Sequence, residues 1–423
     1  MQILSRQDFP TDRKAFVKDF ISGITVAIVA LPLAIGFGIT SGMSAAAGIS
    51  TAIIAGFIAG LLGGSRFQVS GPTGAMTVVL IPVIHNYGIV AIPTLGFMAG
   101  VIVLLMALFK LGNLIKKVPI SVVEGFTVGI ALVISLQQIP YALRVSKGQG
   151  ERTLEVAANT VSDALDIGLK WQTILVVAIT LLIKFNIVRI VESFKIKMYF
   201  PASFSALFLT TLLVNAFDMN VSFIGEIPRN VSTYTSPFLD SGDYISLLLP
   251  AFSIAILVAI ESLLSARVAD DISNTPIDKQ FRPNQELVGQ GAATAVASIF
   301  GGMPATGAIA RTNVNVRSGA ITRVSAMVHS IFLLLIVLFL APIFSHIPSA
   351  AIAGVLIGTS FRIFNKASML EIFRSSKSNI FIYVITALVT VSIDLIWGIA
   401  VGIALYLIIN QFKRAIATKS FRK

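Results

Sequence analysis

Cysteine is absent from the 423-residue sequence, and histidine occurs only three times. The chain therefore has no disulfide or thiol chemistry, and no His/Cys cluster suited to a transition metal. A phosphate-binding loop for ATP is also missing, which argues against a primary pump within this chain. We find no paired carboxylates and no nucleophile–base set at matched depth, so we do not expect an enzyme.

Charge is scarce as well. Charged residues make up 12% of the chain, against about 25% in an average soluble protein. Hydrophobic residues make up 55%, and the mean hydropathy is +0.88. These values indicate one large integral membrane domain that contacts the lipid bilayer. The first residues are too charged for a secretory signal, so we expect residues 1–17 to be a cytoplasmic tail.

The apolar segments predict an all-α polytopic membrane protein, because a spanning helix needs about 20 mostly apolar residues. Several segments are short or interrupted by proline and glycine. We count fourteen candidate spans, at 18–39, 44–63, 69–84, 92–109, 119–140, 172–189, 199–216, 244–265, 285–301, 305–317, 321–343, 347–363, 378–393 and 394–411. The transmembrane domain would therefore cover residues 18–411, followed by a basic tail at 412–423.

The basic residues indicate the orientation of these spans. If the N-terminus is inside, 27 of the 32 lysines and arginines fall on the cytoplasmic side, as the positive-inside rule requires. The five on the outside are Arg144, Lys147, Arg152, Lys170 and Arg229. We therefore expect a multi-pass protein of the cell inner (plasma) membrane with both termini cytoplasmic. The net charge of +12 then marks a cytoplasmic face, and no nucleic-acid partner is expected.

Two short motifs, GPTGAM (71–76) and PATGAI (304–309), lie in the third and tenth spans. Fourteen spans divide into two sets of seven, and an odd number of spans makes the second set enter the membrane from the opposite side. Matching motifs in equivalent spans therefore predict a 7+7 inverted repeat. Such repeats are typical of secondary transporters, whose binding sites lie at broken helices near the bilayer midplane.

The motifs also predict what the site binds. A helix that starts at Pro72 or Pro304 after an extended stretch leaves free N–H groups, and its positive dipole end favours an anion. Thr73 and Thr306 add hydroxyl donors. Glycine next to each threonine lets a ligand approach the backbone closely.

The alternative interpretation of such motifs is close helix packing through small residues. That interpretation fits a single motif better than a duplicated one that contains proline. We assign packing roles to other glycines of the early spans, which are Gly36, Gly38, Gly56, Gly60, Gly63 and Gly64.

Glu261 lies inside an otherwise apolar span, and an intramembrane carboxylate indicates function by default. Ser265 follows one helical turn later on the same face. The two side chains could hold Na⁺ through oxygen ligands, or a desolvated glutamate could carry a proton instead. A purely structural hydrogen bond to a neighbouring helix remains an alternative. Arg311 could supply positive charge to the anion site or anchor its helix toward the cytoplasm.

Several segments resemble the SulP anion transporters, also called solute carrier family 26. The segments are ALPLAIGFG (30–38), SGPTGAMTVV (70–79), AIESLLSARVAD (259–270), ELVGQGAATAVASIFGGMPATGAIARTNVN (286–315) and SGAITRVSAMVH (318–329). The resemblance covers essentially the whole chain. Within the family, the sequence is similar to the bacterial bicarbonate-type members. It implies a core domain (18–110 and 244–343) and a gate domain (119–216 and 347–411), an elevator-type motion of core against gate, and a homodimer. Members usually continue into a cytoplasmic STAS domain, and this sequence ends just before one.

The resemblance also implies roles for individual residues. The family's anion cradle matches Thr73, Gly74, Gly307, Ala308 and Ile309, and Phe37 matches an aromatic lining position. Glu261 and Ser265 match the cation site of sodium-coupled bicarbonate members, in which the acid is shorter. Leu33 stands where several members have glutamine. The full set that we assign to substrate binding is Phe37, Thr73, Gly74, Ala75, Thr306, Gly307, Ala308, Ile309 and Arg311. We assign cation coupling to Glu261 and Ser265. If transport is Na⁺-coupled, Gly307 is a further Na⁺ ligand.

The sequence therefore predicts a secondary active transporter of a small inorganic anion, of the bicarbonate or sulfate class, coupled to H⁺ or Na⁺. It needs no cofactor beyond a coupling ion. A nucleobase/proton symporter of the same fold is the first alternative, but PATGAIA offers no second carboxylate for a base. A dicarboxylate transporter and an uncoupled anion channel remain open.

Overall fold

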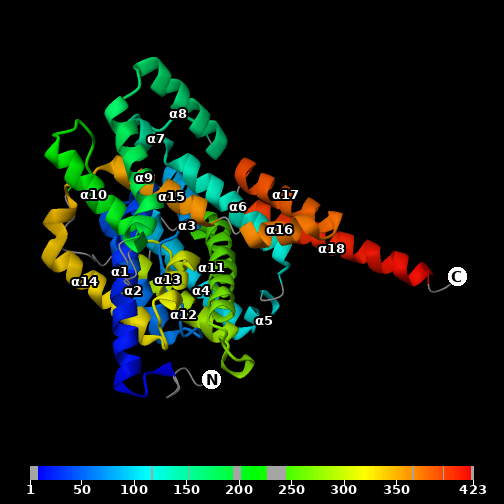
Figure 1. Cartoon of the computed structure of the whole chain (residues 1–423). Helices are drawn as coiled ribbons and strands as arrows, with labels where there is room; N and C mark the ends of the chain where they lie inside the picture. The colour runs from blue at the N-terminus through cyan, green and yellow to red at the C-terminus, as the bar shows by residue number, and fades with distance from the viewer. Residues whose placement is uncertain are drawn as a thin grey trace. The chain divides into compact units, whose positions relative to one another are not determined.

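The computed structural model describes residues 8–115, 118–150, 152–193, 202–225, 244–363, 366–393 and 395–420. This part of the chain is almost entirely helical (Figure 1). It forms two compact units, and each is assembled from segments that are distant in sequence. The first unit contains the described residues within Met1–Lys116, Tyr141–Arg144 and Lys170–Leu356, and the second contains those within Lys117–Pro140, Val145–Leu169 and Ile357–Lys423.

The first unit holds most of the long helices. Its helices are α1 (Arg13–Thr40), α2 (Ala45–Leu62), α3 (Gly74–Tyr87), α4 (Ile92–Leu108), α5 (Gly112–Ile115), α9 (Trp171–Ser193), α10 (Ala202–Ala216), α11 (Tyr244–Ile272), α12 (Pro283–Ile299), α13 (Ile309–Arg317) and α14 (Val324–Phe344), with two short 3₁₀ turns, η2 (Ile89–Ala91) and η3 (Ile277–Lys279). Helix α1 packs on α2 and α14, and α12 packs between α2 and α4.

The second unit is smaller. Its helices are α6 (Ile120–Gln137), α8 (Thr153–Ile167), α16 (Lys366–Arg374), α17 (Lys377–Ser392) and α18 (Leu395–Ser420), while α7 (Ile139–Leu143) and α15 (Ser349–Ile363) contribute residues to both units. Helix α17 packs against α6 and α18. Residues 141–171, which connect the fifth and sixth predicted spans, contain α8.

Apolar helices account for the membrane character of the chain. Among the described residues, six helical segments are long and apolar enough to cross a membrane, and six more are apolar but shorter. Within the described residues, a helix overlaps each of the fourteen predicted spans, and the number of segments that cross the membrane stays a prediction. The chain is thus a mostly helical, multi-pass membrane protein. The seventh and eighth predicted spans are joined by residues 217–243, of which 226–243 lie outside the described residues.

The ends of the predicted domain differ slightly from the helix boundaries. Helix α1 begins at Arg13, five residues before the predicted span, because the side chain of Asp12 accepts a hydrogen bond from the Ala15 amide (2.7 Å) and caps the helix. Helix α18 runs to Ser420, so most of the basic segment at 412–423 continues the last helix.

Small residues let the helices of the first unit approach closely. Helices α2 and α12, together with the segment that follows α12, share a cluster of buried alanines, which are Ala55, Ala59, Ala293, Ala297 and Ala305. A Cβ atom at Gly289 of α12 would lie 2.5 Å from the backbone of Gly63. At Gly38 of α1, a Cβ atom would lie 2.8 Å from the amide of Gly48. These contacts confirm the packing role predicted for Gly38 and Gly63.

Both quoted motifs interrupt their helices with an extended stretch. Strand β1 (Ser70–Gly71) pairs antiparallel with β2 (Thr306–Gly307), in the register Ser70 to Gly307 and Gly71 to Thr306. The helices that follow begin at Gly74 and Ile309. The prediction that they begin at the two prolines is therefore wrong by a few residues. Both prolines lie before the helix, because each motif needs extended backbone to form the strand pair.

Candidate functional site: the two half-helix starts and Glu261

The strand pair brings the first turns of α3 and α13 to the same place in the first unit. Backbone hydrogen bonding between the two segments continues one residue beyond the strands: the Ala308 amide donates to the Val69 carbonyl (3.0 Å). The first amides of each helix have no acceptor within the helix, and they carry the positive end of its dipole. At α3 these are the amides of Gly74 and Ala75, and at α13 those of Ile309 and Ala310. An arrangement of this kind favours a negatively charged group.

A carboxylate from a third helix lies between the two motifs. The Oε2 atom of Glu261, on α11, accepts a hydrogen bond from the Thr306 hydroxyl (2.7 Å) and one from the Thr73 hydroxyl (3.1 Å). The two threonine hydroxyls are themselves 3.1 Å apart. Both threonines are buried, whereas Glu261 is partly exposed. The carboxylate is thus held by both motifs.

Gly307 occupies a tighter position than the sequence suggests. Its amide does not face an open site, because it donates to the hydroxyl of Ser262 on α11 (3.0 Å). A Cβ atom at this position would lie 2.1 Å from Nε2 of Gln68. Because residue 307 has no side chain, the Gln68 amide can pack directly against the backbone of the strand pair.

Ser265 lies one turn beyond Glu261 on the same helix, as predicted, but its partner is different. Its hydroxyl donates to the Thr312 hydroxyl on α13 (3.2 Å), and the Val69 amide donates to that same oxygen (3.1 Å). Ser265 is completely buried. Among the described residues, no group of three His, Cys, Asp or Glu side chains could hold a metal ion. A cation near Glu261 would therefore rely on hydroxyl and carbonyl oxygens besides the one carboxylate.

Arg311 is buried in the protein, with 1% of its surface exposed. One terminal nitrogen donates a short hydrogen bond to the carbonyl of Pro72 in the turn before α3. A Cβ atom at Gly71 would overlap the other terminal nitrogen. The guanidinium also interacts electrostatically with Glu261. This burial favours the predicted role beside the anion site over a role as an interfacial anchor, and the role itself stays a prediction.

The remaining predicted residues surround the two helix starts. Phe37 of α1 is 7% exposed, and its carbonyl accepts a hydrogen bond from the Thr77 hydroxyl in the first turn of α3 (3.4 Å). Ala75 and Ala308 are buried, and Ile309 is partly exposed. The structure thus brings the predicted residues of α1, α3, α11 and α13 together around Glu261, while the binding role of each remains a prediction.

Sequence reasoning missed a set of polar residues behind the strands. The buried carboxylate of Glu286, in the first turn of α12, accepts hydrogen bonds from the side-chain amides of Gln68 (2.7 Å) and Gln290 (2.8 Å). The other hydrogen of the Gln290 amide goes to the Ser70 hydroxyl in β1 (2.7 Å). Ser262 was also missed. Its position next to Glu261 was a signal that could have identified it, whereas the partners of Glu286 other than Gln290 lie more than 200 residues away.

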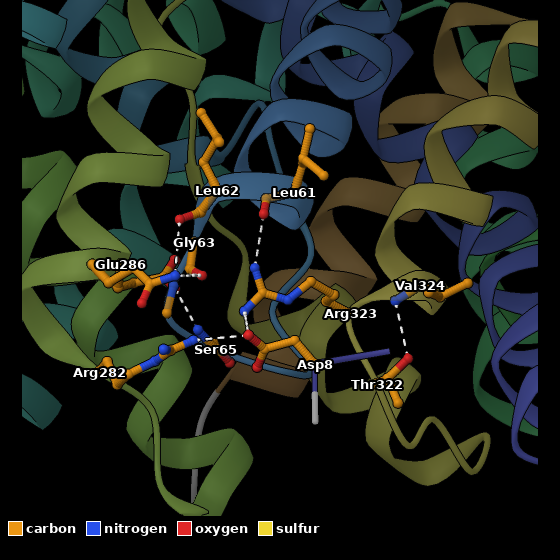
Figure 2. Close-up of polar contacts among 12 residues, drawn as sticks. Asp8, Leu61, Leu62, Gly63, Ser65, Arg282, Glu286, Thr322, Arg323 and Val324 are labelled. Atoms are coloured by element: carbon orange, nitrogen blue, oxygen red, sulfur yellow. Dashed lines mark hydrogen bonds and ion pairs between the residues drawn. The ribbon is translucent and has the colours of Figure 1, made fainter. Parts of the chain in front are cut away.

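Charged residues fix the turn at the end of α2, as Figure 2 shows. Arg323 donates to the Leu61 carbonyl (2.8 Å) and forms an ion pair with Asp8 (3.1 Å), which also pairs with Arg282 (3.0 Å). Glu286 lies on the other side of this turn. The turn is therefore flanked by two positive residues, Arg282 and Arg323, and two negative residues, Asp8 and Glu286. These contacts therefore anchor the end of α2, from which the chain continues to β1 at Ser70.

Comparison with known proteins agrees with this architecture. The model of the sulfate permease family matches residues 16–386. The putative sulfate transporter YvdB of Bacillus subtilis is 37% identical over 395 residues, which cover 92% of this chain and 72% of the relative. The bicarbonate transporter BicA of Synechocystis is 31% identical, over 91% of this chain and 68% of the relative.

Solved structures show the same fold. The transmembrane domain of a cyanobacterial bicarbonate transporter BicA superposes with a TM-score of 0.78 at 26% identity, over 94% of this chain and 98% of that one. The murine Slc26a9 anion transporter superposes with a TM-score of 0.82 at 16% identity, over 96% of this chain and 70% of that one. The chain therefore belongs to the sulfate permease (SulP) family, which is a family of membrane anion transporters and not of enzymes.

Proposed function

We propose that this protein is a secondary active transporter of a small inorganic anion of the bicarbonate or sulfate class. The observation that carries this proposal is the pairing of β1 with β2, which brings two helix starts together at one carboxylate through Thr73 and Thr306. The helix ends supply attraction for an anion, and the carboxylate supplies a charge that a cation must compensate. The names of the relatives support the choice between sulfate and bicarbonate.

The anion is proposed to bind at the first turns of α3 and α13. The amides of Gly74, Ala75, Ile309 and Ala310 are the donors that the helices themselves leave unpaired. Arg311 adds positive charge from behind, and Phe37 closes the α1 side. Unpaired backbone at membrane depth is tolerated only where it lines a site or is buried in protein, which supports a ligand at this position.

Coupling is proposed to run through Glu261. The hydroxyls of Thr73 and Thr306 hold its carboxylate beside the anion site, so a cation bound there would offset the repulsion between carboxylate and anion. The cation is either H⁺ on the carboxylate or Na⁺ coordinated by Glu261 and neighbouring oxygens, with Ser265 and Gly307 as further ligands of Na⁺. In either case the cation is co-transported cargo.

The wider organisation is proposed on the same basis. We propose fourteen spans in a 7+7 inverted repeat, with a core (18–110 and 244–343) that moves as an elevator against a gate (119–216 and 347–411), in a homodimer. The equivalent positions of the two motifs support the repeat. The distribution of lysine and arginine supports cytoplasmic termini in the inner membrane.

The test is uptake into proteoliposomes that contain the purified protein. Radiolabelled bicarbonate, sulfate and fumarate are compared with an inward Na⁺ gradient, with an inward H⁺ gradient, and with neither. We expect uptake of bicarbonate or sulfate above protein-free vesicles and stimulation by one of the two gradients. Uptake of fumarate alone would identify a dicarboxylate transporter, and uptake that no gradient stimulates would identify a channel or uniporter.

A further inference from the structure

Glu286 is a buried carboxylate that the transport mechanism does not use. It lies in the first turn of α12, where the positive end of the helix dipole stabilises a negative charge. Only 1% of its surface is exposed. A buried carboxylate is costly unless it is fully hydrogen-bonded and its charge is compensated, so its contacts indicate what it holds in place.

Four hydrogen bonds saturate this carboxylate. One oxygen accepts the backbone amides of Gly64 and Ser65, both at 2.8 Å. The other accepts the side-chain amides of Gln68 at 2.7 Å and Gln290 at 2.8 Å. The positive charge of Arg323 lies close enough to attract the carboxylate. The four donors come from three places: the turn after α2, the segment leading into β1, and α12 itself.

Two of these donors connect Glu286 to the strand pair. Gln290 bridges Glu286 to the Ser70 hydroxyl in β1 (2.7 Å). The amide of Gln68 lies against the Cα of Gly307 in β2, in the space that a Cβ atom would need. Because both amides donate to the carboxylate, Glu286 fixes which way each of them faces. A single buried charge therefore orients the groups that support both strands.

We propose that Glu286 is a positioning residue for the anion site. It holds β1 and β2 in register through Gln68 and Gln290, and thereby sets the separation of the first turns of α3 and α13. This inference rests on the proposed function and deepens it, because it assigns anion affinity in part to a residue that does not touch the anion.

The first test is Glu286→Gln, measured as sulfate and bicarbonate uptake in proteoliposomes over a range of anion concentrations. The substitution replaces one acceptor oxygen by an NH₂ group. At least one N–H donor that now bonds to the carboxylate would then face another donor, and the side-chain amides of Gln68 and Gln290 would lose their fixed orientation. We expect the KM to rise about tenfold while Vmax stays within about twofold, as for loss of a hydrogen bond to a charged group. An unchanged KM in a well-folded variant would overturn the proposal.

Rescue separates positioning from general stability. In the double variant with Glu286→Gln and Gln290→Glu, the buried carboxylate moves one helical turn along α12 and the numbers of donors and acceptors are conserved. We expect this variant to recover most of the lost affinity. The single variant Gln290→Glu places two carboxylates together. We expect its anion affinity to be lower than that of Glu286→Gln and lower than that of the double variant. A double variant no better than Glu286→Gln would contradict the proposal.

A milder variant and a second measurement cover the case in which Glu286→Gln does not fold. Gln290→Leu removes the link to Ser70 and one of the four donors to Glu286, but leaves the carboxylate with its other three donors, and we expect a KM increase of about threefold. Hydrogen–deuterium exchange is expected to speed up at residues 64–71 and 306–312 and to stay unchanged in α9 and α10. Faster exchange everywhere, or nowhere, would refute the positioning role. This measurement needs no transport, so it distinguishes failure of this inference from failure of the proposed function, in which the wild type takes up neither anion.

Discussion

The hydroxyl oxygens of Thr73 and Thr306 lie 3.1 Å apart, although 233 residues separate them in the sequence. Both hydroxyls donate to the same oxygen of Glu261. The equivalent positions of the two motifs therefore meet at one carboxylate, and a change in any of the three side chains alters the partners of the other two.

Neutralising the carboxylate is expected to uncouple transport. Glu261→Gln keeps the size of the side chain and an oxygen that the threonines can reach, but removes the charge that a cation would compensate. We expect gradient-driven uptake to fall at least about tenfold, while exchange of labelled for unlabelled anion persists. Glu371→Gln on α16, an exposed acid, is the matched control and should behave as wild type. Full gradient-driven uptake in Glu261→Gln would remove this residue from coupling.

The Thr306 hydroxyl is expected to matter for its hydrogen bond and not for its shape. Thr306→Val keeps the branched shape and removes the donor to Glu261, a hydrogen bond to a charged group worth about 1.5–3 kcal/mol. We expect the half-saturating concentration of the coupling ion to rise about tenfold or more. Thr306→Ser keeps the hydroxyl and should stay within about threefold of wild type. An impaired Ser variant beside a Val variant that behaves as wild type would show that the methyl group matters and the hydrogen bond does not.

Gly307 is expected to tolerate no side chain while Gln68 is held by Glu286. In Gly307→Ala the new Cβ atom would lie 2.1 Å from the Gln68 amide, and such overpacking typically costs about 1–3 kcal/mol. We expect anion affinity to fall about tenfold, measured as the KM of uptake. Adding Gln68→Ala makes room for the methyl group, so the double variant should be less impaired than the sum of the two single variants. Strictly additive effects would mean that the two residues do not compete for space.

Arg311 is expected to contribute through both its charge and its planar shape. Arg311→Met fills the apolar part of the space without charge, and we expect the KM for the anion to rise about tenfold or more. Arg311→Lys keeps the charge but loses the planar fork that reaches the Pro72 carbonyl, so an intermediate KM is expected. A Met variant with wild-type affinity would place the anion beyond the influence of this arginine.

Close packing of α2 on α12 is expected to limit substitution at Gly289. The added side chain of Gly289→Val would meet the backbone of Gly63 at 2.5 Å, and backbone gives way less readily than a side chain. We expect a clear loss of thermal stability in detergent, equivalent to about 1–3 kcal/mol. At Gly60 the nearest atom to a new Cβ is the methyl group of Ala326 at 3.2 Å, so Gly60→Ala should be milder. The melting temperature by intrinsic fluorescence measures both.

Much of the architecture could be predicted from the sequence, because each span is a local apolar run and each break contains proline and glycine. The equivalence of the two motifs was likewise visible as repeated letters. Their pairing as strands was not, since hydrogen bonding between Ser70 and Gly307 leaves no mark on local spacing. For the same reason the helix starts were placed at the prolines and not at Gly74 and Ile309.

The polar residues behind the site were harder to find than those within it. Glu261 is conspicuous because its neighbours in sequence are apolar. Glu286 lies in a polar stretch at the start of a helix, where an acidic residue is ordinary. Only its distant partners, Gly64, Ser65 and Gln68, distinguish it from an exposed first-turn glutamate.

The two-residue ladder also has a consequence for biogenesis. During synthesis, Ser70 and Gly71 reach the membrane long before Thr306 and Gly307 emerge from the ribosome. Until then the backbone groups of β1 lack their hydrogen-bond partners in β2, and lipid cannot supply hydrogen bonds in their place. Assembly of the N-terminal half must therefore stay incomplete until the later half is inserted. A nascent chain halted before residue 306 should accordingly be a preferred substrate for membrane quality-control proteases, whereas a chain halted after α14 should be resistant.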